Sequence, residues 1–473
     1  MPNFDDQTIE VLFGADDAEN EEPARFLAYF YFNRAYDSLV ANLPIRILVG
    51  HKGVGKSALL RRAYLDDCEK KHPSIWIQSS DLSPIKDRVS AATEFSGRIE
   101  AWKREILIFL TTATVEQVFG QSPEENRTKI AAGSTQSLVK LLGKTLEEGE
   151  RRGYRAAAIN LYIDDIDRGW AAQQKDISNI SALLNAMRDI AGIDRRIRFR
   201  IGLRSDVYFL VRTSDESTDK IERNVIWLRW NNDEILRLAA KRIETFFGGT
   251  PSNEDLAKIQ QSQISQTVLS KVIDPTFRGL GHWSKRPIHV ILTSLTRARP
   301  RDLVKLFQGA AKKAHAKNHQ IISSEDLESS FQAYSQDRLQ DVINEFRSEL
   351  PEIEKLLLHM RPTKKQRRTA ESYQFTTDQL SVKLQEIMGH VSLRFTNGRY
   401  VTPRSLIQFL YKIDFITARK EDLAGKIDRK YFDESRFLAS EIVEFGYDWE
   451  IHPAYRWALQ PQDIQDVIDS LRG

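Results

Sequence analysis

Cysteine is almost absent from this chain, with Cys68 the one example among 473 residues. A single thiol cannot form an internal disulfide framework, and it suits a reducing compartment. The neighbouring carboxylates of Asp66, Asp67 and Glu69 favour the neutral thiol over the thiolate. We therefore expect neither a disulfide scaffold nor a cysteine nucleophile.

Long apolar runs and a secretion signal are absent as well. No segment approaches the ~18 consecutive apolar residues of a membrane span, and the run Phe26–Phe32 soon meets Asn33 and Arg34. The segment Met1–Asp6 lacks the basic and then apolar layout of a signal peptide. These absences predict a cytoplasmic protein without a membrane partner.

Neither net charge nor histidine content indicates a site. The formal charge is +3, too small a global field to argue for nucleic acid, so that only local patches could do so. The nine histidines show no H-E-x-x-H pattern, which argues against a metal hydrolase. The length predicts two or three domains of ~100–200 residues each.

A phosphate-binding motif is the strongest positive feature. The pattern G-x-x-x-x-G-K-[ST] follows an apolar run, Ile45–Val49, and opens a helix-like stretch, Ser57–Ala63. Its glycines let backbone N–H groups point at one anion, and the helix N-terminus adds partial positive charge. Lys56 is predicted to neutralise the β- and γ-phosphates of ATP, and the Ser57 hydroxyl to bind Mg²⁺. The predicted nucleotide-binding residues are Gly50, His51, Lys52, Gly53, Val54, Gly55, Lys56, Ser57 and Ala58.

A second motif resembles a Walker B strand. The apolar run Ala156–Ile163 ends in Asp164-Asp165-Ile166-Asp167-Arg168. Asp164 is predicted to help hold Mg²⁺ and Asp165 to polarise the attacking water. The alternative is a buried strand that runs into an acidic, helix-capping turn. Because the water-polarising residue is most often Glu, the shorter Asp165 predicts slow or partner-dependent turnover.

Four arginines are candidates for contact with the γ-phosphate. Arg204 follows the strand-like run Ile197–Leu203, where a sensor residue is expected, although a surface arginine fits equally well. Arg299 and Arg301 flank Pro300 at a predicted helix start and could belong to a lid or to an ordinary basic helix terminus. With Arg168, they predict a homo-oligomer in which at least one arginine acts across a subunit boundary.

The fold class predicted from these runs is α/β, with a P-loop core around a parallel sheet. Further strands are expected at Ser74–Gln78, Ile197–Leu203 and Val225–Trp230, alternating with helices as in βαβ units. The region 85–152 is expected to carry two helices, with breaks at 121–123 and 132–134. Its role cannot be read from the sequence.

The C-terminal part suggests a winged helix. The predicted elements are three helices, Glu352–Met360, Thr376–Met388 and Pro403–Tyr411, followed by two strands, Phe415–Arg419 and Glu441–Phe445. The predicted domains are therefore a P-loop core at 1–235, a helical lid at 236–335 and a winged-helix-like domain at 336–473. Trp449 and Trp457 are expected to pack in the interior.

The densest basic run lies between the first two of these helices. Lys364, Lys365, Arg367 and Arg368 are candidates for DNA phosphate contacts. The alternative is a solvated loop that balances nearby carboxylates, with the winged helix acting as a protein-docking module.

These motifs together resemble the KAP and STAND branches of the AAA+-related P-loop ATPases. They are more similar still to a bacterial group with a Gly-His/Arg-Lys-Gly-x-Gly-Lys-Ser-Ala loop and an Asp-Asp-Leu-Asp-Arg-Gly-Trp segment. The resemblance covers about residues 10–335, with the loop its most specific part. It implies a nucleotide domain, a helical lid and ATP-dependent switching or assembly. The membrane helices usual in KAP proteins and the fused effector usual in STAND proteins are both missing here.

The function predicted from these features is an ATP-binding and ATP-hydrolysing switch with Mg²⁺ as cofactor. The resemblance adds a role in antiphage defence or stress, with a separately encoded effector. The alternative is a DNA-binding adaptor in which ATP is mainly a structural ligand. A kinase-like phosphotransferase is disfavoured, because paired Walker B acids suit water activation.

Overall fold

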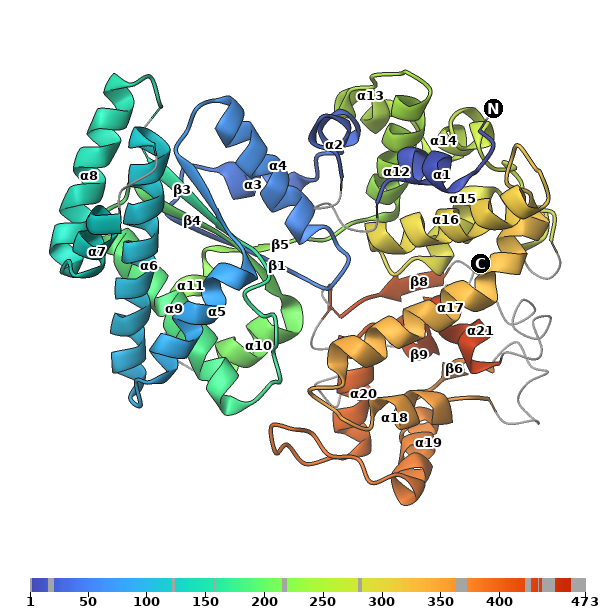
Figure 1. The fold of residues 1–473 in the computed structure, drawn as a ribbon. Coiled ribbons are helices and arrows are strands. Elements are labelled where there is room, and N and C mark those ends of the chain that lie inside the picture. Colours follow the sequence, from blue (N-terminus) through green and yellow to red (C-terminus); the bar gives the residue numbers. More distant parts are fainter. Residues whose placement is uncertain are drawn as a thin grey trace. The chain divides into compact units, whose positions relative to one another are not determined.

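The computed structural model describes residues 2–15, 21–120, 124–155, 158–214, 219–279, 283–362, 372–421, 427–432, 434–435 and 447–460. The chain forms two compact units (Figure 1). Unit 1 consists of Met1–Tyr31 and Trp230–Gly473, and unit 2 of Phe32–Arg229. None of the helices in the described ranges is long and apolar enough to cross a membrane.

Unit 2 is built on a five-stranded parallel sheet. Its strands are β1 (Ile45–Gly50), β2 (Ser74–Ile77), β3 (Ile159–Ile163), β4 (Ile197–Arg204) and β5 (Val225–Trp227), in the order β2-β3-β4-β1-β5. Each predicted strand of the core is confirmed. The apolar runs show little polar alternation because helices cover both faces of the sheet, as in other parallel sheets.

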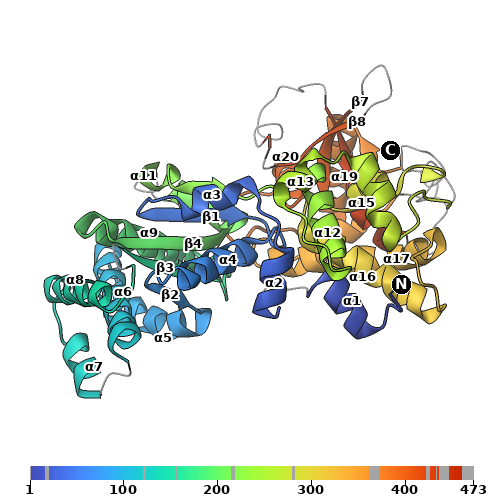
Figure 2. The ribbon, with the colours of Figure 1, turned by 90° about the horizontal axis from the view of Figure 1, so that it is seen from above.

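The helices of unit 2 cover both faces of its sheet (Figure 1 and Figure 2). On one face, α3 packs on α4, and both contact strands; on the other, α9 packs against α6 and α10. This three-layered α/β core is the predicted class. The helices are α3 (Arg34–Val40), α4 (Lys56–Glu69), α5 (Ser79–Ser90), α6 (Phe95–Phe119), α7 (Glu124–Ala131), α8 (Thr135–Arg151), α9 (Gln174–Ile193), α10 (Ser205–Ser214) and α11 (Asp219–Glu222).

The region 85–152 holds more helices than predicted. The end of α5 and the whole of α6, α7 and α8 fall within it, so the expectation of two helices is wrong. The break at 132–134 is confirmed, and the Ser134 hydroxyl accepts a hydrogen bond from the N–H of Ser137 to start α8. The other expected break, 121–123, lies outside the described residues. Leu138, Leu142 and Leu146 form a buried stripe on α8, so this helix is amphipathic and belongs to the core.

Unit 1 contains the N-terminal helices and the predicted lid region. Phe13 stacks on Phe307 with ring centroids 4.8 Å apart, and Gln308 Nε2 donates to the Gly14 carbonyl at 3.0 Å. These contacts attach the chain start to a segment about 300 residues away. The elements are α1 (Asp6–Phe13), α2 (Pro23–Tyr29), α12 (Asn232–Phe246), α13 (Asn253–Lys258), α14 (Gln261–Thr267), η3 (Leu269–Lys271), α15 (Ile288–Leu295), α16 (Pro300–Ala316) and α17 (Ser324–Phe346).

The rest of unit 1 has a winged-helix-like arrangement. Three helices, α18 (Ile353–His359), α19 (Thr377–His390) and α20 (Pro403–Lys412), confirm the predicted ones. They pack with an antiparallel sheet in the order β6-β9-β7-β8, and the predicted strand Phe415–Arg419 becomes β7. The expected strand Glu441–Phe445 lies outside the described residues. The remaining elements are β6 (Gln374–Phe375), β7 (Ile416–Glu421), β8 (Ile427–Lys430), β9 (Asp448–Ile451), η6 (Pro453–Tyr455) and α21 (Arg456–Leu459).

Candidate functional site

The phosphate-binding motif forms a strand, a tight loop and a helix. β1 ends at Gly50, where an added Cβ would lie 2.8 Å from Val54 Cγ2 and 3.2 Å from the Leu228 carbonyl oxygen. Gly53 and Gly55 have φ of 82° and 94°, which side chains rarely adopt. No side chain caps the N-terminus of α4 at Gly55. The N–H groups of its first turn are therefore oriented for an anion.

Lys56 directly follows this loop as the first residue of α4. Its ammonium donates to the carbonyl oxygens of Gly50, at 2.9 Å, and His51, at 3.1 Å. Burial raises the pKa of the Asp164 and Asp167 carboxyls, and the positive charge of Lys56 opposes the rise in both. The loop, its lysine and the Walker B turn therefore form one electrostatic site.

Asp164 and Ser57 form the candidate Mg²⁺ site. Asp164 follows the last residue of β3, is 5% exposed, and lies close enough to the Ser57 hydroxyl for that hydroxyl to affect its pKa. Burial raises the pKa of Asp164, the Ser57 hydroxyl opposes this, and the charge of Asp165 adds to it. Its Oδ2 atom is buried and has no hydrogen-bond partner in the described part of the chain.

That unpartnered carboxylate oxygen beside a hydroxyl fits a hard cation. Mg²⁺ prefers oxygen ligands, and it commonly takes one or two carboxylates together with substrate phosphates and water. Mg²⁺ therefore does not need a larger set of protein ligands. Among the described residues, no group of three or more His, Cys, Asp or Glu side chains could hold a metal ion. Gly202 on β4 leaves room for Asp164, because an added Cβ would lie 2.6 Å from Asp164 Oδ1.

Asp165 lies in the turn that follows Asp164. Its side chain is exposed, and its backbone is left-handed with φ of 52°. Asp and Asn tolerate this conformation better than other non-glycine residues. The turn is closed by hydrogen bonds from the N–H of Arg168 to the Asp165 carbonyl and from the N–H of Trp170 to the Asp167 carbonyl, both 3.0 Å. Asp165 is thus held at the edge of the site with its carboxylate open to solvent.

Arg204 ends β4 directly beside the phosphate loop. It pairs in register with Gly50, and its guanidinium donates to Asp206 Oδ1 at 3.0 Å and Oδ2 at 2.8 Å. Arg204 Nε lies 3.6 Å from Asp167 Oδ2, within ion-pair range but too far for a hydrogen bond. Burial raises the pKa of Asp167 to about 6, although Arg204 and Lys56 oppose the rise. Arg204 therefore lies between the two motifs, where a sensor residue was expected.

Ser205 and Lys86 are two further residues of the site, and neither carries a local sequence signal. His51 and Ser205 are buried, and Nδ1 of the histidine lies 3.2 Å from the serine Oγ, so the phosphate loop is bound to the end of β4. Lys86, on α5, donates to the Ile166 carbonyl at 2.9 Å. Burial lowers the pKa of Lys86, while the charges of Asp167 and Asp176 oppose this. Only the folded chain brings these residues to the site.

The arginines at the start of α16 have different environments. Arg299 is 2% exposed, and its guanidinium lies 2.7 Å from Asp414 Oδ2 and 3.9 Å from Glu345 Oε2. Two carboxylates inside unit 1 thus already match its charge. Arg301 is half-buried, and Arg168, in unit 2, is exposed. The predicted DNA contacts Lys364, Lys365, Arg367 and Arg368 lie outside the described residues.

Arg297, two residues earlier, belongs to a buried ion cluster that the sequence did not reveal. It donates to Asp302 Oδ2 at 2.7 Å and Oδ1 at 2.8 Å, and to the Tyr455 hydroxyl at 2.8 Å. Arg338 donates to Asp302 Oδ1 at 2.9 Å. Despite burial, these two arginines hold the pKa of Asp302 far below its usual value. The cluster joins α16, α17 and the segment before α21 inside unit 1.

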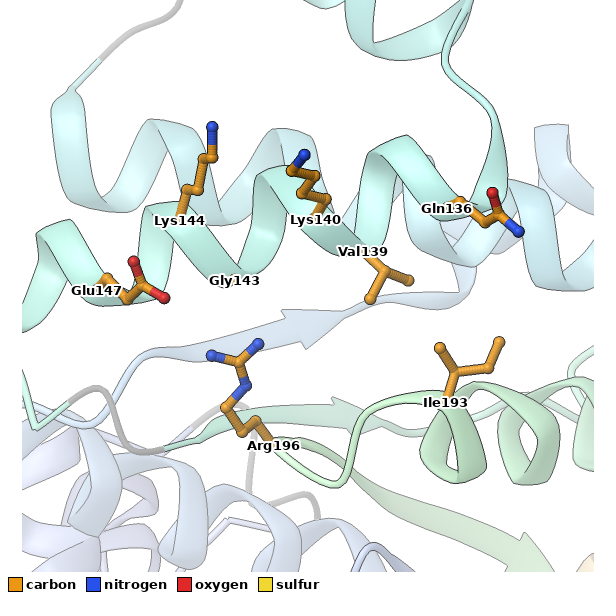
Figure 3. Close-up of a pocket in the computed structure, with 8 residues that line it drawn as sticks. All are labelled: Gln136, Val139, Lys140, Gly143, Lys144, Glu147, Ile193 and Arg196. Carbon is orange, nitrogen blue, oxygen red and sulfur yellow. The ribbon is translucent and has the colours of Figure 1, made fainter.

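A pocket of 480 Å³ in unit 2 lies away from this site. Its lining includes Ile193 at the end of α9 and Arg196 just before β4, so it lies at the amino ends of the strands. Figure 3 shows the Arg196 side chain pointing toward Gly143, with the Lys140 and Lys144 ammoniums turned away from it. The phosphate loop lies at the opposite, carboxyl edge of the sheet, where ligands bind in open α/β sheets.

Comparisons with a family model, with a curated protein and with a solved structure each show a similarity. Residues 233–343 match a family model described as the FunZ-associated C-terminal helical domain. The chain is 21% identical over 529 residues to the putative transposon gamma-delta 80.3 kDa protein of Escherichia coli K12, covering 97% of this chain and 69% of that protein. A solved structure of the Aeropyrum pernix ORC2 protein, in ADPNP-ADP complexes, is 11% identical in sequence and has a TM-score of 0.38. The match covers 97% of this chain and 96% of the ORC2 chain. The family match spans most of α12 to α17.

Proposed function

We propose that this chain binds ATP with Mg²⁺ at the phosphate loop of unit 2 and hydrolyses it, and that the nucleotide cycle drives a conformational switch or assembly. The observation that carries the proposal is that Asp164, which the Ser57 hydroxyl and the Lys56 charge both influence, has a buried carboxylate oxygen without a partner in the described part of the chain. A surface turn rich in glycine and lysine would give no reason for that carboxylate or for the room left by Gly202.

Each residue has a role in this proposal. Backbone N–H groups of the loop and of α4 bind the phosphates, and Lys56 neutralises their charge. Ser57 and Asp164 would hold Mg²⁺, which when bound neutralises charge that develops on the β- and γ-oxygens. Asp165 orients the water whose oxygen bonds to the γ-phosphorus as the bond to the β-phosphate oxygen breaks. The products are ADP and phosphate, and the water's proton leaves through Asp165 to solvent.

The test is phosphate release by the purified chain and by two variants. Asp165→Asn keeps the left-handed backbone accessible, so a loss of turnover reports on the carboxylate and not on the fold. We expect turnover to fall about 10²–10⁴-fold with little change in ATP affinity. Asp164→Asn should instead weaken Mg²⁺-dependent ATP binding. Parental rates of hydrolysis in both variants would remove β3 from the proposed site.

The same assay, run across protein concentrations, tests assembly. Arg168 and Arg301 remain candidates for contact with a nucleotide held by a neighbouring subunit. Arg299 is left out, because its charge is already matched inside unit 1. Activity per subunit should rise with concentration if an arginine acts across a boundary. A flat activity with a monomeric mass in solution contradicts a homo-oligomeric enzyme.

A second candidate function is a DNA-binding adaptor in which ATP is a structural ligand. The winged-helix-like arrangement of α18, α19, α20 and the antiparallel sheet favours it. Here Lys364, Lys365, Arg367 and Arg368 would contact phosphates. The discriminating result is ATP binding without measurable turnover, together with duplex DNA binding that weakens steeply with salt. The separately encoded effector implied by the family resemblance is compatible with either function.

A further inference from the structure

A long segment of unit 1 contains no acidic residue. Between Gly389 and Ile413 there are three arginines, Arg394, Arg399 and Arg404, and no Asp or Glu, although the whole chain has 66 acidic residues among 473. The segment comprises the end of α19, the loop that follows and the whole of α20. All three arginines are exposed.

The first two of these arginines lie outside the ion pairs that the structure describes. Neither Arg394 nor Arg399 forms an ion pair with any residue that the structure describes. Several other arginines of unit 1 are matched by carboxylates, as in the Arg297 and Arg299 clusters. The Arg399 guanidinium lies 6.0 Å from the centre of the Phe395 ring and donates to Gln408 Oε1 on α20. It is thereby held in place on the exposed side of α20.

The loop that carries these arginines is firmly anchored. Val391, Leu393 and Phe395 alternate into the core of the C-terminal part, so Arg394 between them points to solvent. Thr396 donates through its N–H to the Glu349 carbonyl at 3.0 Å and through its hydroxyl to the Ser348 carbonyl at 2.6 Å. Figure 1 shows this loop in orange between α19 and α20.

Tyr400 projects from the same loop and is 91% exposed. Its backbone is fixed on both sides: Gly398 makes a left-handed turn with φ of 77°, and the Ser405 hydroxyl donates to the Tyr400 carbonyl at 3.2 Å. The sequence neighbours Asn397 and Thr402 are polar and exposed, and Val401 is half-buried against the core of the C-terminal part. A rigidly held loop thus presents a bare aromatic ring among arginines.

We propose that the surface formed by Arg394, Arg399, Tyr400 and Arg404, the α19–α20 loop surface, binds a single strand of nucleic acid. Arginines match phosphates in charge and geometry, and an exposed aromatic ring stacks on a base. Stacking needs an unpaired base, because a duplex hides its base faces between neighbouring pairs. An acidic protein partner would also match the arginines in charge, and competition by poly-glutamate distinguishes such a partner from a nucleic acid.

This site is made of other residues than the nucleotide site and the basic run 361–368. It uses residues of α20 and the loop before it, and it requires neither ATP binding nor turnover. Failure of ATP binding at Lys56 would leave it intact. Its own failure would leave the ATPase proposal intact.

The test is fluorescence anisotropy with the full chain and three fluorescein-labelled probes of one mixed 20-nucleotide sequence: single-stranded DNA, the same strand as RNA, and duplex DNA. Tight binding of either single strand supports the site. We expect Tyr400→Ala to weaken that binding about 5- to 100-fold, and Tyr400→Phe to keep it near the parental value. Replacing Arg394, Arg399 and Arg404 by Ala should lower the magnitude of the log K against log[salt] slope by about 2.

The matched control removes the same charge from exposed helices of unit 2, in the triple variant Arg127→Ala, Arg151→Ala and Arg152→Ala. The control should keep the parental affinity and slope. Equal losses in the two triple variants would reduce the effect to net charge and overturn the site. The site would also be overturned if Tyr400→Ala bound all three probes like the parent. Displacement of the strand by poly-glutamate of the same charge at the same concentration would overturn it as well.

Discussion

Different features position the two carboxylates that follow β3. Asp164 occupies space that Gly202 leaves open, and Asp165 depends on a left-handed turn. The aspartate pair could be predicted, because an apolar run that ends in acids is typical of Walker B. The glycine could not, since it lies 38 positions away and reaches the site only when β3 pairs with β4.

Gly202 gives a test that spares every charged group of the site. In Gly202→Ala the new Cβ would lie 2.6 Å from Asp164 Oδ1 and 3.0 Å from Leu60 Cδ1. We expect the carboxylate to be displaced and Mg²⁺-dependent ATP affinity to fall at least tenfold, with the circular dichroism spectrum unchanged. Gly192→Ala is the control, because nothing lies within 4 Å of its added Cβ. Equal ATP affinity in both variants would separate Asp164 from nucleotide binding.

Asp167 makes stability depend on pH in a particular direction. Its pKa is about 6 in the folded chain and 3.8 ordinarily, so between these values the folded state binds the proton more tightly than the unfolded state. Its contribution to the free energy of unfolding therefore falls as pH rises from about 4 to about 6.

The variant Asp167→Asn cannot titrate at this position, so it does not lose this stability as the pH rises. The free energy of unfolding of Asp167→Asn, relative to the parent, should rise by up to about 3 kcal/mol between pH 4 and pH 7 without nucleotide. Urea denaturation at several pH values measures it, with the exposed Asp87→Asn as control. A difference that does not change with pH would mean that Asp167 titrates normally.

The sequence predicts where the helices of the C-terminal part begin. Thr376 and Thr402 open α19 and α20, and each hydroxyl accepts the N–H of the third helical residue, so the predicted starts match. The short strands β6, β8 and β9 were missed, because two to four residues show no periodicity of their own. Their pairing, and not their local sequence, makes them strands.

The Arg297, Asp302 and Arg338 cluster is the sharpest test at the scale of helices and strands. Asp302→Asn would leave two buried guanidiniums without a full counter-charge, and we expect unit 1 to lose about 3–5 kcal/mol of stability. Asp341→Asn removes the more exposed partner of Arg338 and should cost about 0–1 kcal/mol. Chemical denaturation of both variants gives the comparison. Similar midpoints for the two would show that the cluster contributes no specific stability.

The sheet order assembles the nucleotide site from distant segments. β4 lies between β1 and β3, so Arg204 ends beside Gly50, and Gly202 lies beside Asp164. The sequence indicates parallel strands joined by helices, but right-handed connections permit several strand orders. The contact between His51 and Ser205, and the attachment of α1 to α16, are likewise settled by tertiary packing alone.

ATP binding at the phosphate loop should depend on Lys56, with Mg²⁺ held at Ser57 and Asp164. Isothermal titration of ATP into the full chain, with and without Mg²⁺, measures this directly. We expect saturable binding that tightens when Mg²⁺ is present. Lys56→Ala should weaken it about 10- to 150-fold, because a charged hydrogen bond contributes about 1.5–3 kcal/mol. If the parent and Lys56→Ala bind ATP with the same affinity, with or without Mg²⁺, the phosphate loop does not bind ATP through Lys56.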